Sequence, residues 1–337
     1  MRIALDAMGG DHGPKPSVAG AVRALAAAPD LTVVLVGDQN HITPLLAASG
    51  PYPTDRVEIF HCADSVGMNE KPVDALRKKP DNSIARCWQL VATKKVDGLV
   101  SAGNTGAVVA AGLFTKRFLK GVRRPGIAAV MPTVKGRTVI LDVGANVFPK
   151  ALHLLQYGVM GSVYAKHMLG VERPTIGLMN VGEEEGKGHD LVQETYTLFR
   201  SSPFKDRFIG NVEGRDIHRG SCDVIVTDGF VGNVILKHAE GVFEFVMGLV
   251  GKEVLSTLTT DKLAAMTGLK ALADKFHYSA SGGAPLLGID GICIICHGSS
   301  DDRAIANALG VAAQDARVRL NDRIVEELAA LPAIDDE

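Results

Sequence analysis

Short β-branched runs alternate with longer stretches of helical periodicity along almost the whole sequence. The runs that read as buried strands are 2–5, 31–36, 57–60, 98–100, 127–130, 138–141, 175–179, 223–226 and 292–296. The stretches that read as helices are 16–28, 83–94, 105–118, 152–168, 190–200, 234–258, 261–276 and 303–328. Apolar strands separated by helices are typical of a mostly parallel sheet with helices on both faces. We therefore predict the α/β class, as a three-layer α/β/α sandwich.

The organisation of the chain predicts one domain with one insert. No linker rich in Pro, Gly or Ser divides residues 1–337, so we expect a single α/β/α domain. The two neighbouring helical stretches at about 234–276 break the alternation of strand and helix. We expect this helical insert to protrude as a pair of helices and to serve dimerisation, membrane contact or both.

Composition and charge exclude several classes of protein. The chain has 36 Lys and Arg against 38 Asp and Glu, and this net charge of −2 argues against nucleic acid as the main partner. No apolar run reaches the roughly 18 residues of a membrane-spanning helix, and the acidic Asp6 interrupts any signal peptide. The 5 scattered cysteines suit free thiols in a reducing compartment, so a cytoplasmic protein is predicted.

Stretches rich in Gly, Asn and Asp follow most of the predicted strands. In open α/β sheets, ligands bind beyond the carboxyl ends of the strands. Glycines let backbone N–H groups approach an anion, and helix N-termini add positive potential. We therefore predict a cleft for phosphate or a carbonyl group along one edge of the sheet, although the same residues also make ordinary turns. The stretches are 6–12, 101–107, 142–146, 180–188, 227–233, 282–285 and 297–300.

Several familiar motifs of enzyme and cofactor sites are incomplete or absent in this sequence. The stretch from Gly182 to Gly188 has one residue too few for a phosphate-binding P-loop and ends in Gly instead of Ser or Thr. No G-x-G-x-x-G follows a strand, which leaves a dinucleotide site unsupported. Cys293 and Cys296 precede His297 in a C-x-x-C-H pattern, but in a strand the two thiols point to opposite faces, so we predict buried thiols and no metal or haem. No nucleophile elbow occurs, which favours direct attack by a bound nucleophile over an acyl-enzyme.

Seven motifs in order along the chain resemble the PlsX family of bacterial phosphate acyltransferases. They are DAMGGD at 6–11, SAGNTGA at 101–107, DVGAN at 142–146, NVGEEEGKG at 180–188, GNVEGRDI at 210–217, TDGFVGNV at 227–234, and GGAPLLG with HGSS within 282–300. The resemblance implies that acyl-ACP (acyl carrier protein) and inorganic phosphate give acyl-phosphate and ACP, without metal or nucleotide. It also implies a fold similar to the isopropylmalate dehydrogenase and phosphotransacetylase group, and a homodimer.

The implied reaction requires bound phosphate, a stabilised oxyanion and a released thiolate. We assign the binding of phosphate to Lys187 and to the backbone of Gly186 and Gly188. The N-terminus of the helix that follows the 101–106 loop would assist, with Asn104 as a side-chain donor. Replacing Lys187 with Ala is then expected to lower turnover more than tenfold. The candidates for contact with the carbonyl and the oxyanion are Asn146, Asn180, Asn233 and His297. The other predicted substrate-binding residues are Asp6, Gly9, Gly10, Asp11, Gly103, Gly106, Asp142, Asp228 and Gly283.

Structural alternatives accompany these assignments. Each aspartate is equally consistent with a helix cap or a turn ligand. Lys187 is also consistent with a solvated loop lysine, and His297 with a buried core histidine. Among whole functions, a phosphotransacetylase acting on acyl-CoA is the main alternative. A decarboxylating dehydrogenase and a non-catalytic scaffold fit the motifs less well.

Two surfaces are predicted to meet macromolecular partners. ACP is acidic, so its docking site should be basic. The densest basic group lies within 116–124, and a second basic group lies at 77–79. Both groups are also consistent with solvated helix ends. The apolar tip of the insert predicts peripheral contact with membrane lipid, near a downstream membrane glycerol-3-phosphate acyltransferase, or else packing of the dimer or of the acyl chain. The predicted ACP-docking residues are Lys116, Arg117, Lys120, Arg123 and Arg124, and the predicted membrane contacts are Leu255, Leu258 and Leu263.

Overall fold

The computed structural model describes residues 1–258, 260–276 and 282–331. Position 259 of the predicted insert and the last six residues of the predicted domain lie outside the described residues. The strands are β1 (Arg2–Asp6), β2 (Thr32–Gly37), β3 (Val57–His61), β4 (Gly98–Ser101), β5 (Gly126–Thr133), β6 (Gly136–Leu141), β7 (Ile176–Met179), β8 (Phe208–Val212), β9 (Val224–Val226), β10 (Ala284–Leu287) and β11 (Ile292–Ile295). The helices are α1 (Pro14–Ala27), α2 (Gln39–Ala48), α3 (Pro72–Lys78), α4 (Ser83–Ala92), α5 (Thr105–Phe114), α6 (Ala151–Leu169), α7 (Asp190–Ser201), α8 (Gly214–Arg219), α9 (Gly229–Thr257), α10 (Lys262–Phe276), α11 (Asp302–Val318) and α12 (Leu320–Leu328), with a 3-10 turn at Thr54–Arg56.

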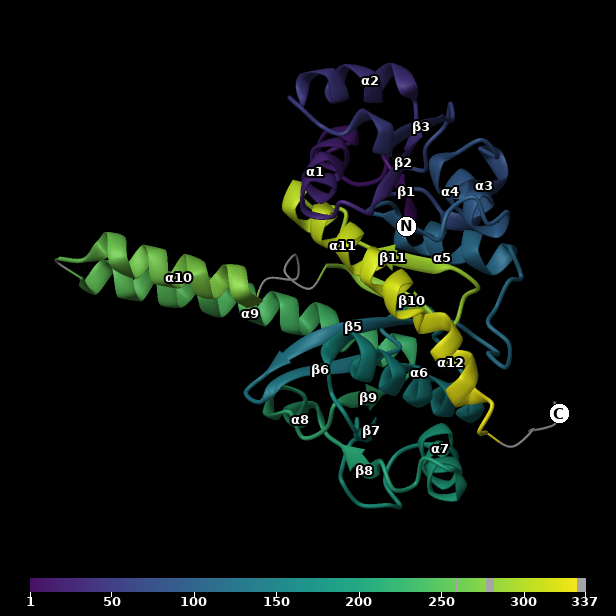
Figure 1. The fold of residues 1–337 in the computed structure, drawn as a ribbon. Coiled ribbons are helices and arrows are strands. Elements are labelled where there is room, and N and C mark those ends of the chain that lie inside the picture. The colour runs from purple at the N-terminus through teal and green to yellow at the C-terminus, as the bar shows by residue number, and fades with distance from the viewer. Residues whose placement is uncertain (259, 277–281, 332–337) are drawn as a thin grey trace.

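The described strands form one sheet in the order β3-β2-β1-β4-β11-β10-β5-β6-β9-β7-β8 (Figure 1). Of its ten strand pairings, seven are parallel and three are antiparallel. The mixed but mostly parallel α/β fold is therefore confirmed. The strands β10 and β11 come late in the sequence but lie between β4 and β5, at the centre of the sheet.

The three antiparallel pairings are consecutive and reverse the polarity of the sheet. They join β11 to β10, β10 to β5, and β5 to β6. Three reversals leave β6, β7, β8 and β9 running opposite to β1, β2, β3, β4 and β11. We call the edge reached by the carboxyl ends of β1, β4 and β11 the β4 edge, and the edge reached by the carboxyl ends of β6, β7 and β9 the β7 edge.

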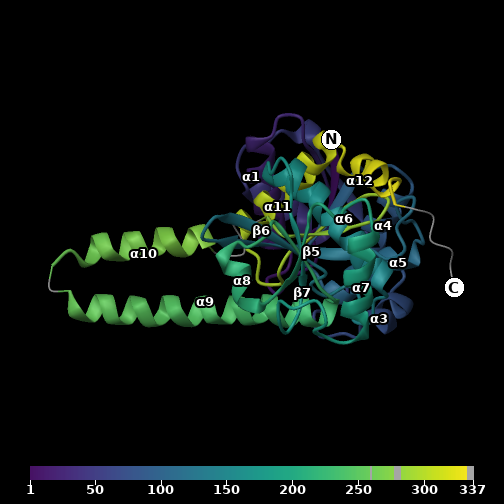
Figure 2. The ribbon, with the colours of Figure 1, turned by 90° about the horizontal axis from the view of Figure 1, so that it is seen from below.

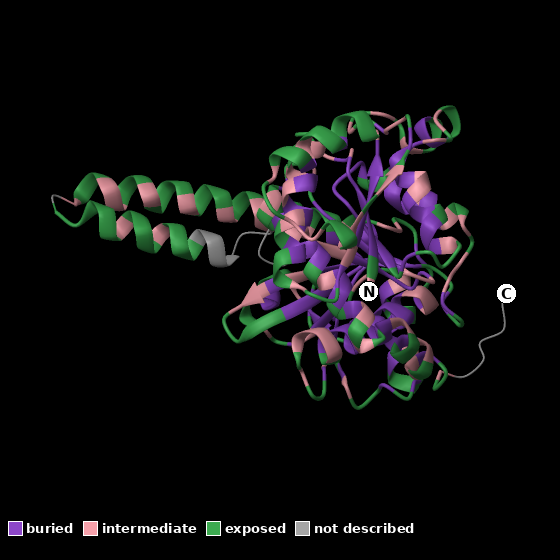
Figure 3. Ribbon diagram, turned by 45° about the horizontal axis from the view of Figure 1, so that its top comes forward, coloured by how far each residue is buried: buried purple, intermediate pink, exposed green. Residues whose placement is uncertain are grey.

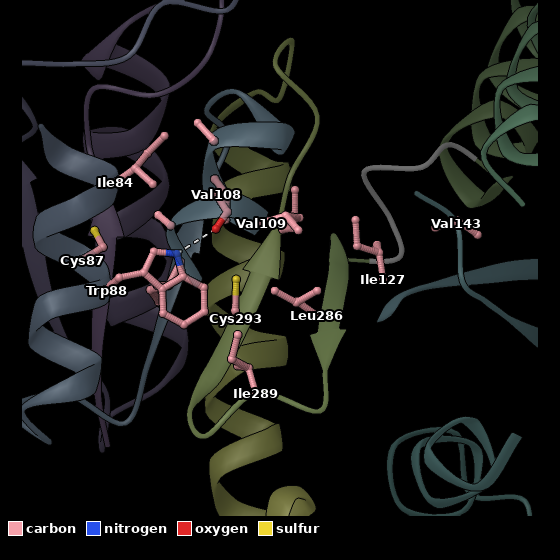
Figure 4. Close-up of a cluster of buried hydrophobic side chains, with 14 of the residues drawn as sticks. Ile84, Cys87, Trp88, Val108, Val109, Ile127, Val143, Leu286, Ile289 and Cys293 are labelled. Atoms are coloured by element: carbon pink, nitrogen blue, oxygen red, sulfur yellow. Dashed lines mark hydrogen bonds between the residues drawn. The ribbon is translucent and has the colours of Figure 1, made fainter. Parts of the chain in front are cut away.

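Alternate side chains of the strands supply the cores on the two faces of the sheet. Ala4 and Leu99 belong to the cluster beneath α3, α4 and α5, whereas Ile3 and Val100 belong to the cluster beneath α1, α2 and α11. A further cluster lies beneath α6, α7 and α12. In the first cluster the indole N–H of Trp88 donates to the Val108 carbonyl oxygen at 2.9 Å (Figure 4). This bond satisfies the one polar group of a side chain that is 3% exposed.

The helices α9 and α10 form the predicted protruding pair (Figures 1 and 2). The first helix begins at Gly229, five residues before the predicted start, because Asp228 caps it directly after β9. The pair projects on the side of the β5–β6 turn, and β5 runs parallel to β4, so it projects from the β4 edge (Figure 1). Its surface is mainly exposed or half-buried, in contrast to the purple sheet of the body (Figure 3). Across the described ranges, no helix combines the length and apolar character that crossing a bilayer requires.

Candidate active site

Asp6 organises the loops at the β4 edge. Its side chain is fully buried and accepts hydrogen bonds from the backbone N–H groups of Met8 at 3.2 Å and Gly9 at 3.1 Å, and from the Ser101 hydroxyl at 2.7 Å. Ser101 Oγ in turn accepts from the Gly103 N–H at 3.0 Å. Burial raises the pKa of Asp6, and these donors oppose that rise. Asp6 thus acts as a turn ligand that ties the β1 loop to the β4 loop.

Glycines let the loops of this edge approach one another at backbone distance. A Cβ on Gly9 would lie 2.6 Å from Gly103 N, and one on Gly10, whose φ is +102°, would lie 2.9 Å from the Gly298 carbonyl oxygen. The exposed Asp11 donates its backbone N–H to that carbonyl at 2.7 Å. The loops after β1, β4 and β11 are therefore in contact, as predicted. Gly283 directly precedes β10 and lies beside Ile295 at the same edge.

Asn104 caps the helix that opens at this edge. Its Oδ1 accepts from the Ala107 N–H at 3.1 Å, so the helix α5 starts directly in the glycine-rich loop. Its Nδ2 donates to the carbonyl oxygens of Met68 and Glu70, each at 3.0 Å, and more weakly to that of Gly67 at 3.4 Å. Both amide hydrogens therefore bind the 67–70 segment, and the anion-binding groups left here are the backbone N–H groups of the helix start. Sequence reasoning missed this segment because it carries no strand or motif signal.

His297 is exposed at the β4 edge and is not a buried core histidine. The Ser299 backbone N–H donates to its Nδ1 at 3.2 Å, and the Ser299 hydroxyl lies 2.7 Å from the same atom. Because a backbone N–H can only donate, Nδ1 is an acceptor and the neutral ring carries its proton on Nε2. The ring can thus present a proton donor at the mouth of the loop cluster.

Asp142 has at the β7 edge the role that Asp6 has at the β4 edge. It is fully buried and accepts the backbone N–H groups of Ile127, Gly144, Ala145 and Asn146 at 2.6–3.1 Å. Burial raises its pKa, against these four donors. The Asn146 amide donates at 2.6 Å to the Pro125 carbonyl oxygen and at 2.7 Å to the Tyr157 hydroxyl. These contacts hold the turn after β6 in shape.

The turn after β9 packs against the turn after β6. Asp228 Oδ1 accepts from the Phe230 and Val231 N–H groups at 2.9 and 3.0 Å, which makes Asp228 a helix cap. A Cβ on Gly232 would lie 1.9 Å from the Asp142 carbonyl oxygen, so only glycine fits there. Asn233 is exposed one residue later, and within the described part of the chain its amide has no hydrogen-bond partner.

Lys187 lies on an exposed loop at the β7 edge. The loop is held from within, since Asn180 Nδ2 donates to the Lys187 carbonyl oxygen at 3.0 Å and Gln193 Nε2 donates to those of Gly186 and Gly188. The Lys187 ammonium has no ion pair among the residues that the structure describes. Three glutamates, 183–185, precede it with only Gly186 between, and their negative charge offsets the attraction of Lys187 for an anion.

The predicted phosphate site therefore does not assemble within one chain. The helix start at Asn104 follows β4, whereas Lys187 follows β7, six strands away and at the opposite edge. Strands are spaced by roughly 4.8 Å, which puts about 29 Å of sheet between them. The expectation of one shared loop edge is wrong for the loops after β6, β7 and β9. Two separate loop clusters exist instead. The one at the β4 edge has the start of α5 with the exposed His297, and the one at the β7 edge has the start of α7 with the exposed His189, preceded by the glutamates at 183–185.

The two basic groups lie at opposite edges of the sheet. The 116–124 group connects the end of α5 to the start of β5, which places it at the β7 edge, and its Arg117 pairs with Asp290 at 2.6 Å. The 77–79 group ends α3, whose Pro72 lies against Gly106 at the start of α5. Arg77 and Lys78 are exposed there. The second group is thus the one next to the β4 edge.

The cysteine prediction is confirmed. All 5 cysteines are buried and free. Cys293 belongs to the core on one face of the sheet and Cys296 to the core on the other. Burial raises the pKa of the Cys296 thiol to about 12, which keeps it protonated and unreactive at neutral pH.

Comparisons with known proteins show the family and the fold of the chain. A family model described as "Fatty acid synthesis protein" matches residues 1–323. A phosphate acyltransferase of Dictyoglomus turgidum is 45% identical over 331 residues, covering 97% of this chain and 98% of the relative. One from Nitratidesulfovibrio vulgaris is 46% identical over 330 residues, covering 97% and 95%. Among solved structures, a phosphotransacetylase from Streptococcus pyogenes matches with a TM-score of 0.63 at 18% identity, covering 94% of each chain. The last likeness shows that the fold is shared.

Proposed function

Because the chain belongs to this family of fatty acid synthesis proteins, whose curated relatives are named phosphate acyltransferases, we propose that it transfers an acyl group from acyl-ACP to inorganic phosphate at the β4 edge. The observation that carries the site assignment is the meeting of three glycine-rich loops at the start of α5, with His297 exposed beside them. The cluster at the β7 edge also has a helix start beside an exposed histidine, His189 before α7, but the three glutamates at 183–185 disfavour an anion there.

Phosphate is bound by the backbone N–H groups at the start of α5. This start is capped by Asn104 and is open to an anion at Thr105 and Gly106, which are both exposed. The partial positive charge of a helix N-terminus favours a dianion there. Phosphate is partly dianionic at neutral pH, so its attack needs positioning more than a strong base.

The reaction balances without a further reactant. A phosphate oxygen forms a bond to the thioester carbonyl carbon, the carbon–sulfur bond breaks, and the proton lost by phosphate balances the proton gained by the thiol. The Nε2–H of His297 stabilises the oxyanion or the leaving thiolate. Asp6 and Ser101 hold the loops that position both substrates.

ACP docks on α3 in this proposal. An acidic carrier needs a basic surface within reach of the site, and Arg77 and Lys78 lie on the helix that packs against the start of α5. Reversing both charges is expected to raise KM for acyl-ACP at least tenfold at low salt, with little change in kcat. The matched control reverses Arg123 and Arg124 at the β7 edge; if only the control raises KM, ACP docks there instead.

The protruding helices serve a second copy of the chain and the membrane in this proposal. Phe245 is 68% exposed on α9, and Leu263 is 79% exposed at the tip of the pair, where Leu255 and Leu258 are half-buried. A homodimer would cover the apolar flank, and the tip would rest in the lipid interface beside the membrane acyltransferase that takes the product. Loss of vesicle flotation in an intact Leu263→Asp dimer would support the membrane contact, and unchanged flotation would exclude it.

The reaction is tested by phosphate-dependent release of free thiol from palmitoyl-ACP, with acyl-phosphate trapped by hydroxylamine. Trapped product equal to released thiol is expected. A parallel assay with palmitoyl-CoA separates the carriers, since the shared fold with phosphotransacetylases makes CoA the competing substrate. Thiol release from palmitoyl-CoA alone would show that ACP is not the carrier. Release from neither thioester by the folded protein would show that the proposed reaction is wrong.

A further inference from the structure

A cavity of about 170 Å³ lies on the face of the sheet opposite α9, between the C-terminal half of α6, α12 and the turn before β8. It is smaller than the roughly 300–1,000 Å³ of pockets for drug-sized ligands. It is far larger than the roughly 30 Å³ that one water occupies in the liquid. It belongs to neither loop cluster and has no role in the acyl transfer proposed above.

The cavity carries a polar group without a partner. The Ser162 side chain lines it and is 1% exposed, yet its hydroxyl has no hydrogen-bond partner among the described residues. A helical serine ordinarily satisfies its hydroxyl on the carbonyl one turn earlier. Leaving a buried hydroxyl unsatisfied costs about 1–3 kcal/mol. A ligand that accepts this hydrogen bond would remove that cost.

The charged groups around Ser162 define the chemistry of the ligand. Lys166 on α6 is exposed and makes no ion pair in the described part of the chain. Arg323 on α12 lines the cavity and donates its Nε–H to the Val318 carbonyl oxygen at 2.8 Å, and its two terminal nitrogens have no partner among the described residues. Arg207 is already neutralised by Glu327 at 2.6 Å. The two positive charges of Lys166 and Arg323 therefore exceed the one negative charge that remains in the lining, that of Glu326.

We propose that this cavity binds a small tetrahedral oxyanion, such as phosphate or the phosphoryl group of a small metabolite. The Ser162 hydroxyl donates to one oxygen, and Lys166 and Arg323 pair with the others. The planar guanidinium and the compact ammonium suit the geometry and charge of such an anion. The site is separate from the start of α5, so the chain would hold two anions at once.

His167 reports on occupancy because it lines the same cavity. Burial, then Arg323 and Lys166, lower the pKa of this histidine, and Glu327 opposes them. A bound dianion near these groups should raise its pKa by about one unit. NMR titration of the histidine ring protons follows this directly, and His297 reports on the β4 edge in the same spectra.

The experiment titrates the full-length protein with inorganic phosphate, and separately with sulfate, at constant ionic strength set with KCl. A saturable rise in the pKa of His167 is expected with both anions. Lys166→Glu should weaken the apparent affinity at least tenfold, Ser162→Ala should weaken it less, and Lys15→Glu on α1 should leave it unchanged. Tighter binding of phosphoethanolamine than of phosphate would identify a metabolite as the source of the phosphoryl group, and weaker binding would identify the free anion.

Three results would overturn the proposal: no change at His167 up to the highest phosphate concentration that stays in solution, an equal change with chloride, or an equal affinity in Lys166→Glu. Acyl transfer is assayed on the same variants. Loss of the His167 response with normal turnover therefore separates this site from the proposed active site, and failure of one does not decide the other.

Discussion

Asp315 makes the stability of the fold depend on pH in a direction opposite to that of most carboxylates. It lies on α11 with 4% of its surface exposed, and its Oδ1 has no hydrogen-bond partner within the described residues. Burial raises its pKa from 3.8 to about 7. The protonated form is thus the one that the fold accepts, and ionisation is resisted by the core around it.

The magnitude follows from the two pKa values. Below pH 3.8 the carboxyl is protonated in both states, and its contribution to stability is fully present. Between 3.8 and about 7 the unfolded chain ionises first, so stability falls by about 1.4 kcal/mol per pH unit. The total loss is about 4 kcal/mol above pH 7, of which about 3 kcal/mol falls between pH 5 and pH 8.

We expect Asp315→Asn to remove this pH dependence. Urea unfolding at pH 5 and pH 8 gives the free energy of unfolding of the wild type and the variant. Relative to wild type, the variant should gain about 3 kcal/mol on going from pH 5 to pH 8, whatever fixed cost the new amide brings. Asp302→Asn, at the exposed start of the same helix, is the matched control. A pH-independent difference between Asp315→Asn and wild type would refute the argument.

Three further outcomes follow from the geometry. His297→Ala should lower kcat at least tenfold at saturating phosphate, whereas Lys187→Ala should change turnover less than threefold; the opposite ranking would place phosphate at the β7 edge. Gly232→Ala should destabilise the fold by more than about 3 kcal/mol in urea unfolding, since its Cβ would lie 1.9 Å from the Asp142 carbonyl oxygen, and a normal unfolding midpoint would contradict this contact. Ser101→Ala should weaken the link between the β1 and β4 loops and raise KM for phosphate with the fold intact; an unchanged KM would show that Gly103 is held without it.

Local sequence patterns predicted most elements, because strands buried on both faces read as continuous apolar runs. The failures have local causes. The strand β8 contains Gly210 and Asn211, which weaken its β signal, and β10 is short and contains Pro285. The stretch 303–328 was expected as one helix but is two, because Arg319 adopts a left-handed conformation with φ of +52°. No side-chain pattern in that stretch indicates this break.

The site was predictable in its parts but not in its assembly. Asp6 acts as a turn ligand, and Asn104 and Asp228 act as helix caps. The sequence allowed these roles, because each residue stands in a turn that follows a predicted strand. Which loops share an edge depends on strand direction, and that information lay in the spacing of β5 and β6. Seven residues separate the two predicted runs, 127–130 and 138–141, and no helical crossover fits in that length. The hairpin, and with it the reversal of the sheet, could have been inferred from this spacing.

The position of β10 and β11 at the centre of the sheet has a consequence for synthesis. The edge of β5 is made by residue 133, but its partner β10 begins only at residue 284. At 5–20 residues per second, a ribosome leaves that edge unpaired for roughly 8–30 s, and it leaves the edge of β4, whose partner β11 begins at residue 292, unpaired for roughly 10–40 s. Two half-sheets must therefore stay apart and avoid pairing with other chains until the last strands emerge to join them. A nascent chain stalled before residue 284 would lack the middle of its sheet and not merely its end.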